Sequence, residues 1–146
     1  MDLFTDMNAQ IAQFPLWLQW WLTWMQTVLI LLPFVFIKRR EAQVLIVAQI
    51  LNFAVGGWVY VVEGYQVTKL FGLGHVFWTV AYGYFLRRLW TGQADIQARP
   101  FYRAWLYTAM VTLTISLPVD AYDLAKYAGG MRAPMVEYYG GAAPGA

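Results

Sequence analysis

Four long apolar runs, separated by short polar or charged segments, constrain the fold of this chain more than any other feature of its sequence. The runs cover about residues 16–37, 42–62, 70–86 and 104–121. Each approaches the roughly 20 residues that a helix needs to cross a hydrocarbon core about 30 Å thick. The pattern predicts an all-α integral membrane protein, built as an antiparallel four-transmembrane-helix bundle.

The composition supports this class. Of the 146 residues, 60% are hydrophobic and 12% are charged, whereas soluble domains carry about 25% charged residues. The chain therefore has too few charged residues to cover a water-soluble surface. We interpret residues 1–130 as a single four-span membrane domain and residues 131–146, rich in Gly, Ala and Pro, as a flexible outer tail.

The distribution of basic residues predicts the orientation. Seven of the ten Lys and Arg residues fall in the first and third connections between the apolar runs. The positive-inside rule places both connections in the cytoplasm. With four spans, both termini then lie on the non-cytoplasmic side of the cell (inner) membrane. The residues that we expect to contact anionic lipid headgroups are Arg39, Arg40, Arg87 and Arg88.

The N-terminal segment before the first apolar run has a helical pattern of its own. Leu3, Met7, Ile11 and Phe14 recur at helical spacing, which predicts a short amphipathic helix at the membrane surface. The first sixteen residues carry no Lys or Arg, so we expect no cleavable signal peptide. The chain has no Cys, which excludes disulfides and thiolate metal sites.

Polar residues inside the apolar runs form one stripe on each predicted helix. On the second run, Gln49, Asn52, Gly56 and Glu63 fall within a narrow arc at 100° per residue. Neutral residues of this kind either hydrogen-bond between helices or line a polar pathway. The sequence leaves both roles open.

An ionisable cluster is predicted at the outer end of the bundle. Glu63, His75, Asp120 and Asp123 are expected at the same membrane level, on three different helices. A histidine there either carries protons, gates a pathway, binds a divalent cation or locks the bundle by a hydrogen bond. The residues that form our candidate polar, proton or ion site are His75, Glu63, Asp120, Asp123, Asn52 and Gln49. Their spacing gives no metal or haem signature, and no cofactor is predicted.

Three classes of function remain open at this level. The favoured hypothesis is an oligomeric pathway for ions, protons or a small solute, because four helices enclose little space by themselves. The alternative is a non-catalytic accessory or assembly subunit of a larger membrane complex, docked through its Trp-rich first run. An intramembrane enzyme is the third, although no recognised catalytic motif is present. The expected partners are lipid, further copies of the chain or another membrane protein, and not nucleic acid.

Overall fold

The computed structural model describes residues 3–93 and 99–139, and within these ranges every regular element is a helix. The all-α class is therefore confirmed. In chain order the elements are α1 (Leu3–Ile11), α2 (Leu16–Met25), η1 (Gln26–Leu31), α3 (Leu32–Val35), α4 (Arg40–Val62), η2 (Lys69–His75), α5 (Val76–Trp90), α6 (Pro100–Ala128) and α7 (Met135–Tyr139).

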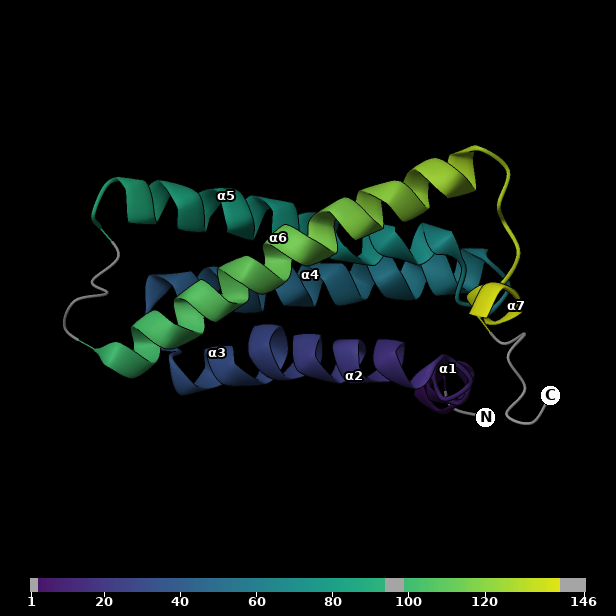
Figure 1. The fold of residues 1–146 in the computed structure, drawn as a ribbon, viewed down its shortest axis with the longest axis horizontal. Coiled ribbons are helices and arrows are strands. Elements are labelled where there is room, and N and C mark those ends of the chain that lie inside the picture. The colour runs from purple at the N-terminus through teal and green to yellow at the C-terminus, as the bar shows by residue number, and fades with distance from the viewer. Residues whose placement is uncertain (1–2, 94–98, 140–146) are drawn as a thin grey trace.

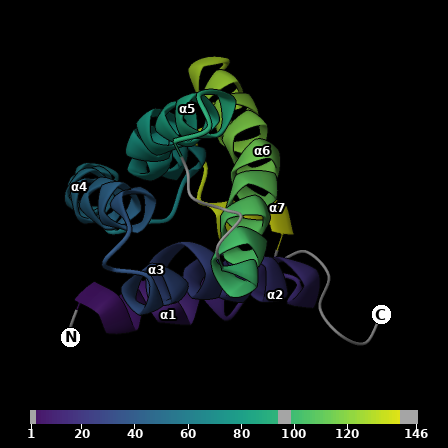
Figure 2. The ribbon, with the colours of Figure 1, turned by 90° about the vertical axis from the view of Figure 1, so that its left-hand side faces the viewer.

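The long helical segments lie side by side and alternate in direction (Figure 1). α2, η1 and α3 follow one another as a first segment, α4 returns, η2 and α5 form the third segment, and α6 forms the fourth. Viewed along the long axis, they surround a common centre (Figure 2). We call the end that carries the α3–α4 and α5–α6 connections the basic end, and the end that carries α1 and α7 the terminal end.

Two helices in the described part of the chain are long and apolar enough to cross a membrane. They are Leu16–Val35 and Arg40–Val62. In the most apolar stretch of each helix, the larger share of the residues is not buried inside the protein. Apolar side chains on the outside of a helix are typical of contact with lipid. These two candidate spans support a membrane protein, while four spans, the inner membrane and the side of the termini stay predictions.

The first segment changes helix type part-way along. Gln26–Leu31 is a π-helix, and it closes with the Leu32 N–H donating to the Thr27 carbonyl. Pro33 follows immediately, lacks an N–H, and its ring would clash with the carbonyl four residues earlier in a regular α-helix. The wider turn before Pro33 relieves that clash.

The third segment begins as a 3-10 helix instead of the α-helix expected from residue 70. Two glycines allow this segment to pack closely on both neighbours. A Cβ atom at Gly72 would lie 3.2 Å from the Asp120 carbonyl oxygen on α6, and one at Gly74 would lie 3.2 Å from the Gly56 Cα on α4. This packing places His75 at the junction between η2 and α5.

α6 continues well beyond the apolar run of residues 104–121. It runs unbroken through Pro118 and ends at Ala128, before Gly129. Its last turns carry Asp120, Asp123 and Tyr127, which the spacing of three and four residues places on one face. The long helix therefore delivers these polar groups to the terminal end.

Two clusters of buried side chains hold the fold together. The larger lies between the four long segments and includes the fully buried Leu29, Leu45, Phe85 and Leu106. The smaller, at the terminal end, is formed by Phe14, Tyr60 and Val67.

α7 covers this second cluster. The Met135 N–H donates to the Val67 carbonyl at 2.7 Å, and Tyr139 packs edge-on against Phe14 with 6.1 Å between ring centroids. Part of the segment expected to be a flexible tail is thus helical and packed, because Tyr139 contacts Phe14 and Trp17 and the Met135 backbone bonds to Val67. Residues 140–146 of that tail lie outside the described residues.

Candidate functional site

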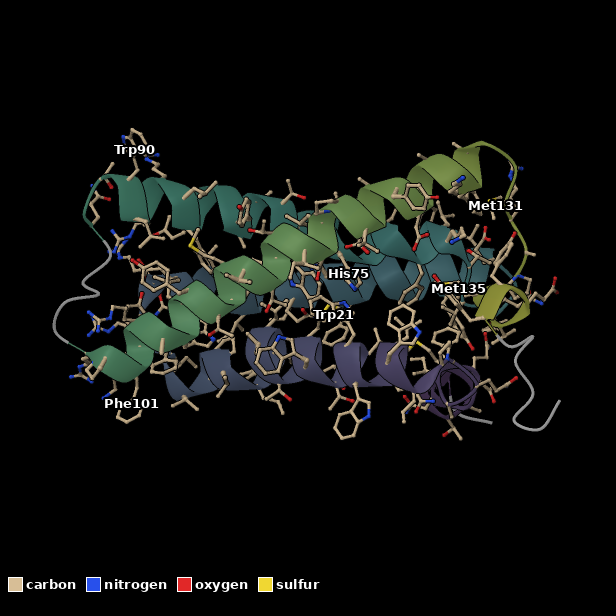
Figure 3. The ribbon with its side chains drawn as sticks, viewed as in Figure 1. Trp21, His75, Trp90, Phe101, Met131 and Met135 are labelled. Atoms are coloured by element: carbon tan, nitrogen blue, oxygen red, sulfur yellow. The ribbon has the colours of Figure 1, made fainter. Side chains whose placement is uncertain are left out.

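A groove of about 190 Å³ lies in the terminal half of the molecule, between the first segment, α4 and the η2–α5 junction. Its wall is largely apolar, and its polar side chains come from three elements. Those that matter chemically are Gln26, Gln49, Asn52 and His75, with Trp78 beside them. Figure 3 shows His75 near the middle of the long axis of the bundle. Apolar pockets with a few convergent polar groups are typical binding sites.

His75 is paired with Asp120 across the η2–α6 contact. Its Nδ1 lies 3.0 Å and 3.1 Å from the two carboxylate oxygens, and the side chains are 22% and 19% exposed. A carboxylate oxygen accepts hydrogen bonds, so this contact suits the tautomer that carries its proton on Nδ1. The imidazole ring stacks on Trp78, with 4.3 Å between centroids and 8° between planes. Within the described residues, Nε2 has no hydrogen-bond partner.

Asn52 joins α4 to the first turn of α5. Its Oδ1 accepts a hydrogen bond from the Phe77 backbone N–H at 2.9 Å. The first N–H groups of a helix have no partner inside the helix, so Asn52 caps α5 from a neighbouring helix. The bond also fixes the orientation of the Asn52 amide, because only its oxygen can accept a hydrogen bond from the Phe77 N–H. The Asn52 Nδ2 is buried and has no partner among the described residues.

Gln49 makes a similar contact one turn away. Its Oε1 accepts a hydrogen bond from the Trp78 indole Nε1 at 3.1 Å. Gln49 and Asn52 are three residues apart, so they share one face of α4. Gln49 and Asn52, from the polar stripe predicted on this helix, therefore accept interhelical hydrogen bonds through their oxygens and also line the groove.

The remaining predicted carboxylates bind other partners. Asp123 accepts from the Lys69 Nζ at 2.6 Å, and these side chains are 15% and 7% exposed. Glu63 accepts from the Tyr127 hydroxyl at 2.6 Å, and this hydrogen bond raises the pKa of Tyr127. The predicted cluster is thus divided, among the described residues, into three pairs, and one of them joins two predicted members, His75 and Asp120.

The two partners Lys69 and Tyr127 were not among the predicted site residues. Tyr127 is four residues after Asp123 and on the same helix face, which was a usable signal. Lys69 is separated from Asp123 by 54 positions, and nothing in the local sequence relates the two. Within the described ranges, no group of three or more His, Cys, Asp or Glu side chains is placed to hold a metal ion.

A second polar cluster lies at the basic end. Glu41 is 2% exposed and accepts hydrogen bonds from the Arg88 Nε at 2.8 Å and the Tyr102 hydroxyl at 2.6 Å. Burial and the bond to Glu41 raise the pKa of Tyr102. The Arg39 guanidinium lies 5.0 Å from the centre of the Tyr102 ring. The sequence did not predict this cluster, because Glu41 and Arg88 lie beside connections between apolar runs, where charged residues are expected to be exposed to solvent.

The four arginines predicted to contact lipid therefore differ in their surroundings. Arg88 is engaged with Glu41 and Arg39 lies over Tyr102, and both are half-buried. Arg40 and Arg87 are exposed.

A wide groove of about 690 Å³ lies on another face, between α2, α6 and α7. Trp17, Trp20, Trp21 and Trp24 form much of its wall. Trp17 and Trp20 are more than half exposed, at 62% and 67%, while the Trp24 indole donates to the Thr112 hydroxyl at 3.1 Å. The density of aromatic residues noted in the first apolar run is thus concentrated on one surface.

Comparison with known proteins gives no assignment. No protein-family model matches the chain. No curated protein and no solved structure matches it either. The two grooves and the polar pairs are therefore the features of the chain that bear on its function.

Proposed function

We propose that this chain is a four-span membrane protein whose His75–Asp120 pair transfers protons, alone or together with a small solute, along a pathway completed by an oligomer. The observation that carries the proposal is the state of the His75 ring. One nitrogen is bound to a carboxylate, and the other has no partner among the described residues, in a side chain that lines the groove.

The chemistry of this pair suits reversible protonation. The Nδ1–H stays bonded to Asp120 while Nε2 takes up or releases a proton, so the ring keeps its orientation through both states. The Asp120 carboxylate stabilises the imidazolium that forms when Nε2 is protonated. Stacking on Trp78 holds the ring in place.

The packing of the half of the molecule toward the basic end favours a pathway built from several copies of the chain. Leu29, Leu45, Phe85 and Leu106, all 0% exposed, fill the space between the segments toward the basic end. These four apolar side chains cannot relay a proton that reaches His75 from the groove. We therefore propose that the route continues along the surface between copies of the chain.

The proposed orientation places the basic end in the cytoplasm and both termini on the non-cytoplasmic side of the inner membrane. The cluster of basic residues at one end supports this orientation by the positive-inside rule. Arg40 and Arg87 are then exposed at the level of the lipid headgroups. The groove opens in the outer half of the membrane.

Proton flux into proteoliposomes tests the proposal. A potassium gradient drives the flux and an enclosed pH-sensitive dye reports it. We expect His75→Ala and Asp120→Asn to lower the flux at least about tenfold, because proton relays commonly contribute factors of about 10²–10⁴. Tyr127→Phe is the matched control, since it removes an outer hydrogen bond away from the groove. Flux equal to that of empty liposomes, or unchanged in His75→Ala, would refute the proposal.

The Trp-lined groove favours a second candidate function, that of an accessory subunit bound to a larger membrane complex. Trp17 and Trp20 in its wall are exposed, and tryptophan is enriched among the residues that contribute most to binding at protein interfaces. A photo-crosslinking residue at Trp20 in native membranes is expected to capture one defined partner. The same residue at Val80, which is 66% exposed on α5 and does not line this groove, is the control. Capture of only this chain, or equal capture at both positions, would exclude this role.

A further inference from the structure

The groove beside His75 contains amide groups whose hydrogen-bonding capacity is only half used. Asn52 and Gln49 both use their oxygens to accept hydrogen bonds from α5. Neither amide nitrogen has a partner among the described residues. Gln26, on the facing π-helix, also lines the groove, and its side chain makes no hydrogen bond within the described part of the chain. Three carboxamides from two elements thus offer unused N–H donors in one place.

Unused donors in apolar surroundings are costly. A buried donor without a partner costs about 1–3 kcal/mol, and in lipid no water from outside relieves it. Most of the remaining groove wall is formed by apolar side chains such as Met25, Ile30 and Phe53. A molecule that fits this wall must therefore combine an apolar body with an oxygen that accepts hydrogen bonds.

We propose that the groove binds a small uncharged molecule with a carbonyl-type oxygen, and that the amides of Asn52 and Gln49 donate to this oxygen. Among the described residues, the groove wall contains no Lys, Arg, Asp or Glu side chain, and His75 is engaged with Asp120, so the wall favours no net charge on the ligand. The groove volume, about 190 Å³, is somewhat larger than the 150 Å³ cavity that holds benzene in a well-studied protein. The ligand is therefore the size of a single substituted ring.

The position of the groove explains how such a molecule enters. The groove lies between the two candidate spans, Leu16–Val35 and Arg40–Val62, and the exposed Gln26 and Phe53 stand on either side. An uncharged molecule dissolved in the lipid reaches the amides from the side without crossing the basic end. The inference deepens the proposed function and rests on it only for the step in which the bound molecule is carried.

Two probes of the same shape test the inference. Acetophenone carries a carbonyl oxygen, and α-methylstyrene replaces that oxygen by a CH₂ group. Equilibrium binding of each radiolabelled probe is measured on the purified full-length chain in lipid nanodiscs, with empty nanodiscs as the background. We expect saturable binding of acetophenone, and binding of α-methylstyrene at least about tenfold weaker, because it leaves the amide donors unpaired.

A pair of glycine variants locates the binding. Gly57 lines the groove and a Cβ there meets no atom within 4 Å, so Gly57→Leu fills the groove without disturbing the amides. Gly83 is equally free of contacts on α5 and away from the groove, which makes Gly83→Leu the matched control. Both changes raise helix propensity, so both variants are expected to fold. We expect Gly57→Leu to lose saturable binding and Gly83→Leu to keep it.

Three results overturn the inference. The first is equal binding of acetophenone and α-methylstyrene, and the second is undiminished binding of acetophenone by Gly57→Leu. The third is no saturable binding of either probe, which would mean that water binds the amide groups. Each result is independent of the flux assay. If proton flux depends on His75 but neither probe binds, only the ligand site is refuted. If acetophenone binds but no proton flux is found, only the proposed proton transfer is refuted.

Discussion

Buried charges at the terminal end depend on single partners. Lys69, 7% exposed, has its ammonium group 2.6 Å from Asp123, and the rings of Tyr138 and Tyr139 lie within 5.3 Å and 6.0 Å of it. Removing one member of such a pair strands the other charge in a poorly solvated place. The pair therefore stabilises the contact between η2 and α6 mainly because neither charge is tolerated alone.

A double-mutant cycle measures this dependence. We expect Asp123→Asn to lower the free energy of unfolding by about 3–5 kcal/mol, because it leaves the Lys69 ammonium without its carboxylate. Lys69→Met combined with Asp123→Asn is expected to recover much of that loss, since no charge remains. Unfolding by denaturing detergent provides the measurement. Losses that simply add in the double variant would show that the two residues are not coupled.

Tyr102 makes the stability of the basic end depend on pH. Its phenol has a pKa raised above the usual 10.0 by burial and by the bond to Glu41. The native state therefore keeps this proton at pH values where the unfolded chain has lost it. The resulting stabilisation is fully present below pH 10.0 and disappears as the pH rises through the raised native pKa.

Tyr102→Phe tests this dependence. Near neutral pH the variant is expected to lose about 1.5–3 kcal/mol of unfolding free energy, because a hydrogen bond to a carboxylate is lost. Above pH 10.0 the difference between the variant and the natural chain is expected to shrink. Unfolding curves at neutral and alkaline pH give both values. A difference that stays constant with pH would contradict the raised pKa.

Among the elements, η2 has the closest backbone contacts that the structure records at a glycine. Gly72 approaches the Asp120 backbone of α6, and Gly74 approaches the Gly56 backbone of α4. Backbone atoms cannot move aside as a flexible side chain does. The position of η2, and with it the His75–Asp120 distance, therefore depends on the absence of side chains at these two positions.

Alanine substitutions at glycines separate packing from helix propensity. Gly72→Ala is expected to destabilise the protein by about 1–3 kcal/mol, because its Cβ would lie 3.2 Å from a backbone oxygen. Gly83→Ala, where a Cβ meets nothing within 4 Å, is expected to be neutral or to stabilise by about 0.5–1 kcal/mol. Thermal unfolding in one detergent compares the two. Equal effects would mean that close packing of η2 does not matter.

The elements were more predictable from the sequence than their contacts. Hydropathy placed α4 and the first segment within two residues of their observed ends, because apolar runs and helix lengths are set by the same local residues. The 3-10 start at Lys69 was missed, since it depends on how closely Gly72 and Gly74 pack on other helices. The pairing of Asp123 with Lys69 was missed for the same reason, because it joins residues 54 positions apart.

At the scale of the whole molecule, the central question is how many segments cross the membrane. Within the described residues, two segments are long and apolar enough to cross a membrane. η2–α5 and α6 pack against them along their lengths, and their exposed apolar side chains include Val80, Val111 and Ile115. A segment packed alongside a span and covered with apolar side chains is best accommodated within the same hydrocarbon layer. The exposed apolar side chains of η2–α5 and α6 therefore favour four spans over two.

Single-cysteine labelling decides between the two arrangements, and the chain's lack of Cys removes any background. A membrane-impermeant maleimide is applied to cells from outside. With four spans, Gln66→Cys, in the exposed connection after α4, is expected to react, and Thr91→Cys, at the basic end of α5, to be protected. With only two spans everything after Val62 lies outside, so both would react. Lys38→Cys is protected in either arrangement and serves as the control. Labelling of Thr91→Cys in intact cells would therefore reduce the membrane domain to the first two segments, and His75 and Asp120 would lie on segments that do not cross the bilayer.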